Sequence, residues 1–152
     1  MTQSATLAAP EETAARPVNR NTIAWFELPV RDLARATRFY EHIFQTRLLT
    51  NDQFPGLAMF PRRDAHAVTG ALIEIHPASH ESDAPRNLCG QPSTDGAVVY
   101  LSCDGQLDAV VRRARSAGAT LIEEVAQIPG GIGYSAQFRD LDGNRIGLHA
   151  AF

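Results

Sequence analysis

The sequence predicts an α+β fold that is built from two tandem βαβββ modules. A β-branched and aromatic segment beginning near residue 23 is followed directly by an amphipathic helical pattern. The same order of patterns returns from residue 98. Each copy is followed by three further short strand-like segments that are bounded by turn residues. An internal repeat of this length outweighs any single-residue signal when a fold is inferred.

In the first copy, residues 23–30 form the predicted strand, and Asp32 is the predicted N-cap of a helix over residues 33–44. Further strands are predicted over 46–50, 57–60 and 68–76. Apolar side chains three and four positions apart should give this helix one buried face. These side chains are Leu33, Ala36, Phe39, Tyr40, Ile43 and Phe44.

In the second copy, a strand over 98–103 precedes Asp104, which corresponds to Asp32 as the expected cap. The helix is predicted over 107–117 and ends at Gly118, a typical C′ residue. The remaining strands are predicted over 120–128, 134–139 and 145–150. The pattern of the second copy is therefore βαβββ again.

These patterns divide the chain into four parts. Residues 1–21 carry no periodicity, and we expect a disordered tail. The first module is expected over 22–76 and the second over 96–152. Residues 77–95 are polar and contain several prolines, which is typical of a linker.

Composition excludes several classes of partner. The formal net charge is −3, and acids and bases are interleaved, so no basic stripe for nucleic acid or anionic lipid is expected. No apolar run approaches the length of a membrane span. Cys89 and Cys103 belong to no metal-binding or redox motif, and the N-terminus does not resemble a secretion signal. We therefore expect a cytoplasmic protein.

The segments 26–33 and 38–41 (FELPVRDL and RFYE), together with 138–149 (FRDLDGNRIGLH), resemble signatures of the vicinal oxygen chelate superfamily. This superfamily contains glyoxalase I, bleomycin-resistance proteins and extradiol dioxygenases. The resemblance covers roughly residues 22–151. It implies that the modules form one curved, eight-stranded, cup-shaped sheet with the helices outside. It also implies a homodimer.

In metal-dependent members, the ligands come from the first and last strands of each module. The corresponding positions here are Trp25, Glu74, Ala97 or Val98, and Gly147. Three of these four positions lack a donor atom, so the resemblance implies a member without the usual metal site.

Strand parity predicts other polar groups beside those positions. Glu27, His76 and His149 each lie two residues from one of them, so each should share its face. With Glu74, they could line a cavity for proton transfer, or bind a displaced divalent metal such as Zn, Fe, Mn or Ni. A third interpretation is that Glu27 and His149 only hydrogen-bond each other.

Together these observations predict a small-molecule pocket, in either a ligand-binding protein or a metal-free enzyme. The alternative is a metal-dependent lyase, isomerase or dioxygenase that uses the displaced Glu/His site. Glu27 and His149 are the candidate catalytic residues. The candidate ligand-binding residues are Trp25, Glu74, His76, Tyr100, Tyr134 and Gly147.

Overall fold

The computed structural model describes residues 22–75 and 90–151, and its elements follow the predicted order. Residues 22–75 are called module one below, and residues 90–151 module two. Module one contains β1 (Trp25–Val30), α1 (Leu33–Phe44), β2 (Leu49–Thr50), β3 (Leu57–Met59) and β4 (Thr69–Glu74). Module two contains β5 (Val99–Ser102), α2 (Leu107–Ser116), β6 (Thr120–Gln127), β7 (Tyr134–Arg139) and β8 (Arg145–Ala150). Neither helix is long and apolar enough to cross a membrane.

Each module forms a four-stranded mixed sheet, and the two sheets have equivalent strand orders. Sheet A has the order β1-β4-β3-β2, and sheet B has the order β5-β8-β7-β6. In both, the first strand pairs in parallel with the last, and the other pairs are antiparallel. The predicted two-module α+β fold is therefore confirmed. Among the described residues, no ladder joins the two sheets, so the eight strands are divided into four and four.

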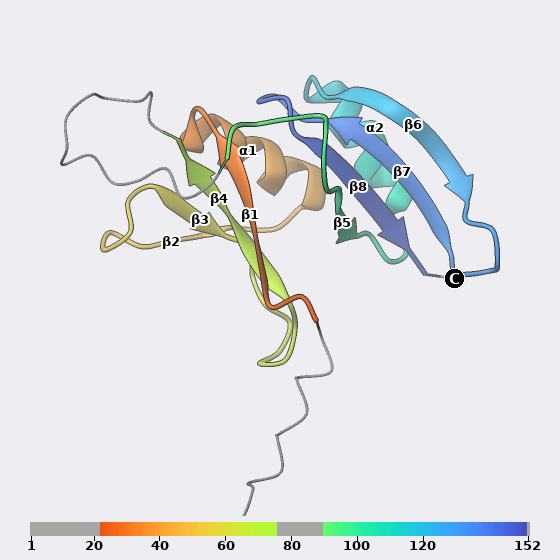
Figure 1. Cartoon of the computed structure of the whole chain (residues 1–152), viewed down its shortest axis with the longest axis horizontal. Coiled ribbons are helices and arrows are strands. Elements are labelled where there is room, and N and C mark those ends of the chain that lie inside the picture. The colour runs from red at the N-terminus through yellow and green to blue at the C-terminus, as the bar shows by residue number, and fades with distance from the viewer. Residues whose placement is uncertain (1–21, 76–89, 152) are drawn as a thin grey trace, which may run out of the picture.

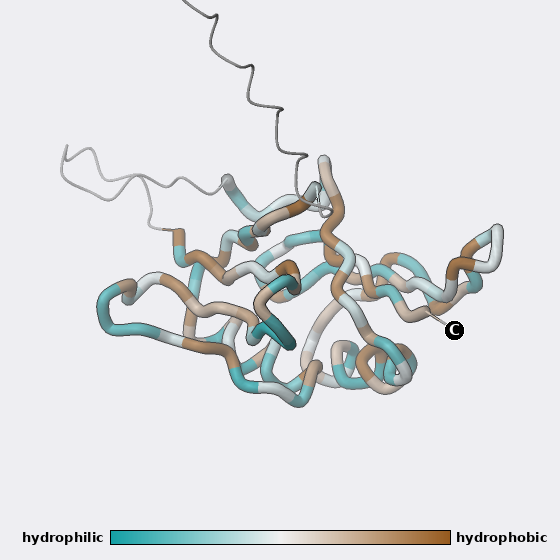
Figure 2. The backbone as a smooth tube through the Cα atoms, turned by 90° about the horizontal axis from the view of Figure 1, so that it is seen from below, coloured by the Kyte–Doolittle hydropathy of each residue, from teal (hydrophilic) through white to brown (hydrophobic). Residues whose placement is uncertain are grey.

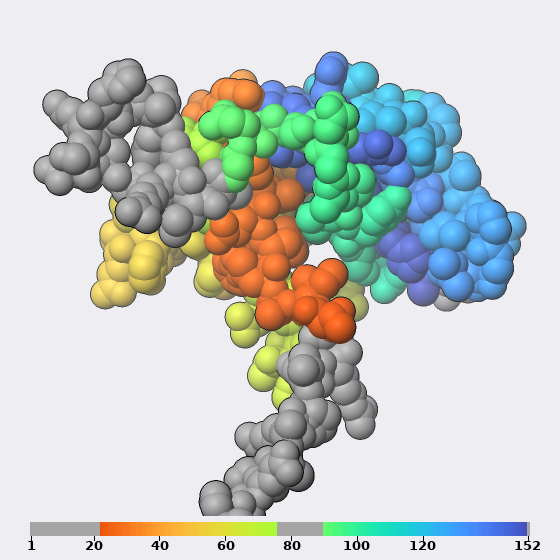
Figure 3. All heavy atoms as spheres, viewed as in Figure 1, coloured from red at the N-terminus to blue at the C-terminus, as the bar shows by residue number. Residues whose placement is uncertain are grey.

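The sheets lie side by side, with both helices behind them in the view of Figure 1. The residues that lead into β5 run along the seam between β1 and the strands of sheet B (Figure 3). Ser93 belongs to this segment, and its carbonyl oxygen accepts a hydrogen bond from the backbone N–H of Arg145, at 3.0 Å.

Helix α1 begins and packs as predicted. An Asp32 carboxylate oxygen accepts a hydrogen bond from the backbone N–H of Arg35 at 2.8 Å, which satisfies one of the free donors of the first turn. The helix ends at Gln45, whose φ of 51° is left-handed. The predicted apolar face is buried against sheet A through Ala36, Phe39, Tyr40 and Ile43.

Helix α2 begins at Leu107, as predicted, but its predicted cap is wrong. Its N-cap is Gln106, and this side chain makes no capping hydrogen bond. Asp104 is not the cap, because Gly105, with a φ of 72°, turns the chain between them. Leu107, Val110, Val111 and Ala114 form the buried face. Figure 2 colours the whole backbone by hydropathy, and brown apolar and teal polar positions alternate along the tube.

The β7–β8 turn joins the two modules. A carboxylate oxygen of the buried Asp142 accepts hydrogen bonds from the backbone N–H of Arg31 at 2.9 Å and from the Arg35 guanidinium at 2.8 Å. The hydroxyl of the buried Tyr40 donates to Asp140 at 2.7 Å. The Asn144 amide donates to the carbonyl of Pro29 at 2.8 Å. These contacts set the start of α1 against module two.

Candidate functional site

Each sheet has one face toward the helices and one face away from them, which is called the front face below. Successive side chains of a strand point to opposite faces. Leu28 of β1 and Leu148 of β8 belong to the buried core, so their sequence neighbours point to the front. The front face of sheet A therefore carries Trp25 and Glu27. The front face of sheet B carries Tyr100, Ser102, Gln137, Gly147 and His149.

Glu27 and His149 both lie on front faces, as parity predicts, but each contacts a different partner. Glu27 is exposed, and its carboxylate accepts a hydrogen bond from the indole N–H of Trp25 at 3.1 Å. His149 Nε2 lies 3.0 Å from the carbonyl oxygen of Ile132. Among the described residues, no hydrogen bond joins Glu27 to His149. A carbonyl oxygen only accepts, so Nε2 carries the proton, and Nδ1 is the nitrogen that can accept one.

Glu74 does not join Glu27. It pairs in register with Val30, whose side chain is fully buried on the helix side of sheet A. Its carboxylate accepts a hydrogen bond from the backbone N–H of Leu33 at 3.0 Å, which caps the first turn of α1. Sheet A thus separates the two carboxylates. His76 lies outside the described residues.

Tyr100 covers Gly147. The two residues are register partners on β5 and β8, and a β-carbon at position 147 would lie 2.4 Å from Cδ1 of the Tyr100 ring. Because Gly147 has no side chain, the ring can cross β8 toward β7. There the Tyr100 hydroxyl oxygen accepts a hydrogen bond from the Gln137 amide at 2.7 Å.

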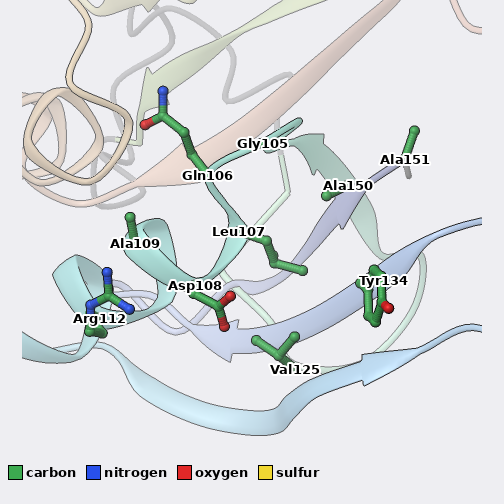
Figure 4. A pocket seen from close by; sticks show the side chains of 10 residues that line it. All are labelled: Gly105, Gln106, Leu107, Asp108, Ala109, Arg112, Val125, Tyr134, Ala150 and Ala151. Carbon is green, nitrogen blue, oxygen red and sulfur yellow. The ribbon is translucent and has the colours of Figure 1, made fainter.

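Tyr134 lies apart from the other candidates. Its register partner, Ala150, is buried on the helix side of sheet B. Tyr134 lines a pocket of about 680 Å³ between the start of α2 and the strands. Figure 4 shows Tyr134 and Val125 across from Leu107 and Asp108.

A second cavity, of about 310 Å³, lies between the two modules. Module one contributes three phenylalanines, whose ring centroids are 5.6 Å apart for Phe26 and Phe60 and 6.5 Å apart for Phe44 and Phe60. Module two contributes Leu101 and Ser102. The other lining residues are Pro61, Arg63, Ala67, Val68 and Thr69. This combination of size and largely apolar lining is typical of small-molecule sites.

The rim of this intermodule cavity is polar. The Ser102 hydroxyl donates to the Asp104 carboxylate at 3.2 Å, and Ser102 is the register partner of His149. The pKa of Asp104 lies below its usual value, chiefly because the carboxylate accepts the backbone N–H of Ala151 and the Ser102 hydroxyl. The charges of Arg63 and His149 lower this pKa further. The rim thus brings a guanidinium, a carboxylate and an imidazole close to the cavity.

A family sequence profile matches residues 22–148 and describes the Glyoxalase/Bleomycin resistance protein/Dioxygenase superfamily. The chain belongs to this superfamily. No curated protein sequence matches the chain significantly.

Solved structures of the superfamily share the fold. A glyoxalase/bleomycin resistance protein from Albidiferax ferrireducens is 19% identical with a TM-score of 0.67, over 87% of this chain and 100% of that one. Another from Streptomyces is 25% identical with a TM-score of 0.56, over 84% and 99%. The fosfomycin resistance protein FosX from Listeria monocytogenes is 17% identical with a TM-score of 0.57, over 87% and 94%.

In this superfamily member, the four positions expected to hold a metal do not fit one. Trp25, Gly147 and either Ala97 or Val98 supply no metal-binding side chain. The fourth residue, Glu74, caps α1 on the helix side. Residues 22–75 and 90–151 contain no group of three or more His, Cys, Asp or Glu side chains placed to hold a metal ion.

Sequence reasoning missed the cavity between the modules and the role of Gln137. Phe26, Phe44 and Phe60 are distant in sequence, and each is also consistent with an ordinary core position. One available signal was the apolar Phe26 between the two front-facing residues Trp25 and Glu27. Gln137 carried a signal as well, because it is a polar residue at a central position of a predicted strand.

Proposed function

We propose that this superfamily member binds a small, largely apolar molecule in the intermodule cavity, without a resident metal. The observation that carries the proposal is the set of three phenylalanine rings facing a space of about 310 Å³ that residues of both modules line. Aromatic rings bury large apolar areas and fix the orientation of a flat ligand. A polar rim on one side of an apolar cavity suits a molecule with one oxygenated end.

The rim determines whether binding is accompanied by chemistry. His149 Nδ1 can accept a proton while Nε2 is held by the Ile132 carbonyl. Trp25 and Glu27 flank the cavity residue Phe26 in β1, but alternation turns their side chains to the front face, away from the Phe26 ring. We therefore keep both forms of the proposal, a ligand-binding protein and a metal-free enzyme acting by proton transfer.

The test of binding uses 1-naphthol as the probe in isothermal titration calorimetry. We expect saturable binding to the full chain and its loss in Ala67→Trp, because the indole would fill the cavity. Ile122→Trp is the matched control, because Ile122 is an exposed residue of β6 outside the cavity lining. Equal binding to both variants would show that the probe sits elsewhere.

The candidate catalytic residues have their own test. His149→Ala and Glu27→Gln should weaken the binding or turnover of an oxygenated ligand. The melting temperature of each variant should stay close to that of the unsubstituted protein. If each variant loses stability and binding in proportion, these residues support the fold and not the site.

A displaced metal site is the second candidate, favoured by the front-face positions of Glu27 and His149. In this form, Zn, Fe, Mn or Ni would be held by these two residues together with His76. Elemental analysis of protein purified without a histidine tag tests it. Stoichiometric metal that disappears in Glu27→Gln and His149→Ala would replace the metal-free proposal with this one.

We also propose that the protein acts as a cytoplasmic homodimer, since β2 and β6 are the outer edge strands of the two sheets and edge strands favour association. Multi-angle light scattering at micromolar concentration should give about twice the chain mass of 16.5 kDa. A mass of one chain would reject the dimer.

A further inference from the structure

A directional chain of hydrogen bonds crosses the front face of sheet B. The guanidinium Nε of Arg145 donates to the amide oxygen of Gln137 at 2.5 Å. The amide nitrogen of Gln137 then donates to the hydroxyl oxygen of Tyr100 at 2.7 Å. These hydrogen bonds therefore lead from β8 through β7 to β5, and they pass over Gly147.

The chemistry of these groups determines the direction of the chain. An arginine has only donors, so the amide of Gln137 must present its oxygen to Arg145 and its NH₂ group to Tyr100. Gln137 is 6% exposed, so water does not readily take over either contact. The Tyr100 oxygen is thereby the acceptor, and its own proton must point away from Gln137. Tyr100 is 48% exposed, so this O–H is available to a ligand.

The neighbouring side chains add positive charge. Arg139 is the register partner of Arg145, so both guanidinium groups lie on the front face. Among the described residues, none makes a hydrogen bond or ion pair with the Arg139 side chain. A nitrogen of Arg145 lies 3.7 Å from the Glu123 carboxylate, which offsets one of the two positive charges. Within the chain of hydrogen bonds, the Gln137 amide oxygen and the Tyr100 hydroxyl oxygen already accept hydrogen bonds. The groups left for a ligand are donors, namely the Tyr100 O–H and the guanidinium N–H groups.

We infer that Tyr100, Arg139 and Arg145 form an oxyanion subsite that takes a small monocarboxylate. One carboxylate oxygen accepts from the Tyr100 hydroxyl and the other from the arginines, and a planar ligand body lies against the Tyr100 ring. Gln137 is a positioning residue, because it acts on the ligand only through Tyr100. The site lies on the front face of sheet B, away from the phenylalanines of the intermodule cavity, so it does not depend on the proposed function.

The experiment uses benzoate as the probe and the full chain labelled with ¹³C at Cζ of tyrosine. The chain has three tyrosines, so Tyr100→Phe assigns the signal of interest. We expect benzoate to shift the Tyr100 signal saturably with a millimolar dissociation constant, while Tyr40 and Tyr134 stay in place. Benzyl alcohol, which has the same ring without the charge, should give no saturable shift.

Three variants separate the roles, with benzoate binding followed by calorimetry. Arg139→Gln and Tyr100→Phe should each weaken binding by about tenfold, the size expected for a lost hydrogen bond to a charged group. Gln137→Glu should abolish binding although Tyr100 is intact. The new carboxylate would accept a hydrogen bond from the Tyr100 hydroxyl, so this donor would no longer be available to benzoate. Arg47→Gln is the control, since the Arg47 side chain is 90% exposed and belongs to module one.

Four results would overturn the inference. The first is the absence of a saturable Tyr100 shift, and the second is equal binding of benzyl alcohol. The third is unchanged benzoate affinity in Arg139→Gln or Gln137→Glu. The fourth is that Tyr100→Phe or Arg139→Gln converts a dimer to a monomer in light scattering, which would identify the patch as a contact between copies of the chain.

Discussion

The ring of Tyr100 occupies the space into which a side chain at Gly147 would project. A β-carbon there would lie 2.4 Å from the ring, closer than van der Waals contact permits. Gly147→Ala should therefore displace Tyr100 and break its hydrogen bond to Gln137, at a cost of about 1–3 kcal/mol in the free energy of unfolding.

Urea unfolding measures this cost, and Gly56→Ala is the matched control. A β-carbon at Gly56 would have no heavy atom within 4 Å, so that variant should change stability much less. Equal effects of the two substitutions would mean that the Tyr100 ring yields without cost.

Phe39 anchors α1 in the core that both modules share. The side chain is 4% exposed, and its ring contacts Tyr40 at 5.1 Å and Phe138 of β7 at 6.0 Å between centroids. Phe39→Ala should reduce the free energy of unfolding by about 3–5 kcal/mol, because it leaves a cavity. Thermal unfolding checks this, and an unchanged melting temperature would contradict it.

Glu74 should affect stability and leave ligand binding unchanged. Glu74→Ala removes the acceptor of the Leu33 N–H and should cost about 1 kcal/mol, as the loss of a helix cap does. Amide exchange in the first turn of α1 should accelerate. Asp32→Ala, which removes the acceptor of the Arg35 backbone N–H at the N-cap of α1, should behave similarly. Loss of a bound metal in Glu74→Gln would instead assign Glu74 to a site.

Cys103 should make the protein less stable in alkali. Burial, with a smaller contribution from the charge of Asp104, raises the pKa of the Cys103 thiol from 9.0 to about 12. The unfolded chain therefore releases this proton first, so the contribution is fully present below pH 9 and falls as the pH rises toward 12. Between pH 8 and pH 10 the loss should be roughly 1 kcal/mol.

Urea unfolding of the Cys89→Ser protein at the two pH values, compared with Cys89→Ser/Cys103→Ala, isolates this loss. The hydroxyl of Tyr40 also has a raised pKa, because it is buried beside Asp140, and it is present in both proteins. A pH dependence that is identical in the two proteins would rule out Cys103 as its source.

The order of the elements was predictable from local patterns. The apolar spacing of Ala36, Phe39, Tyr40 and Ile43 corresponds to the buried face of α1, and Gly118, with a φ of 99°, ends α2 as predicted. Such features depend on neighbouring residues and on backbone geometry. Asp104 resembled Asp32, but the left-handed Gly105 moved the start of α2 beyond its reach.

The candidate site was predictable only in part. Parity placed Trp25 with Glu27, and a hydrogen bond joins them on the front face. The same reasoning placed Glu74 with Glu27, although β4 pairs with β1 in a register that turns Glu74 toward α1. Parity states which residues of one strand share a face, but the register between strands decides which face that is.

The sequence by itself thus determined the two repeated modules, their elements and the absence of donor side chains at Trp25 and Gly147, because these follow from residue identity and local spacing. Only the tertiary structure decided that Phe26, Phe60 and Leu101 surround one cavity and that Tyr100 reaches Gln137 across Gly147. The physical reason is that these contacts join strands remote in sequence, and their geometry is set by sheet register and by the packing of one module on the other.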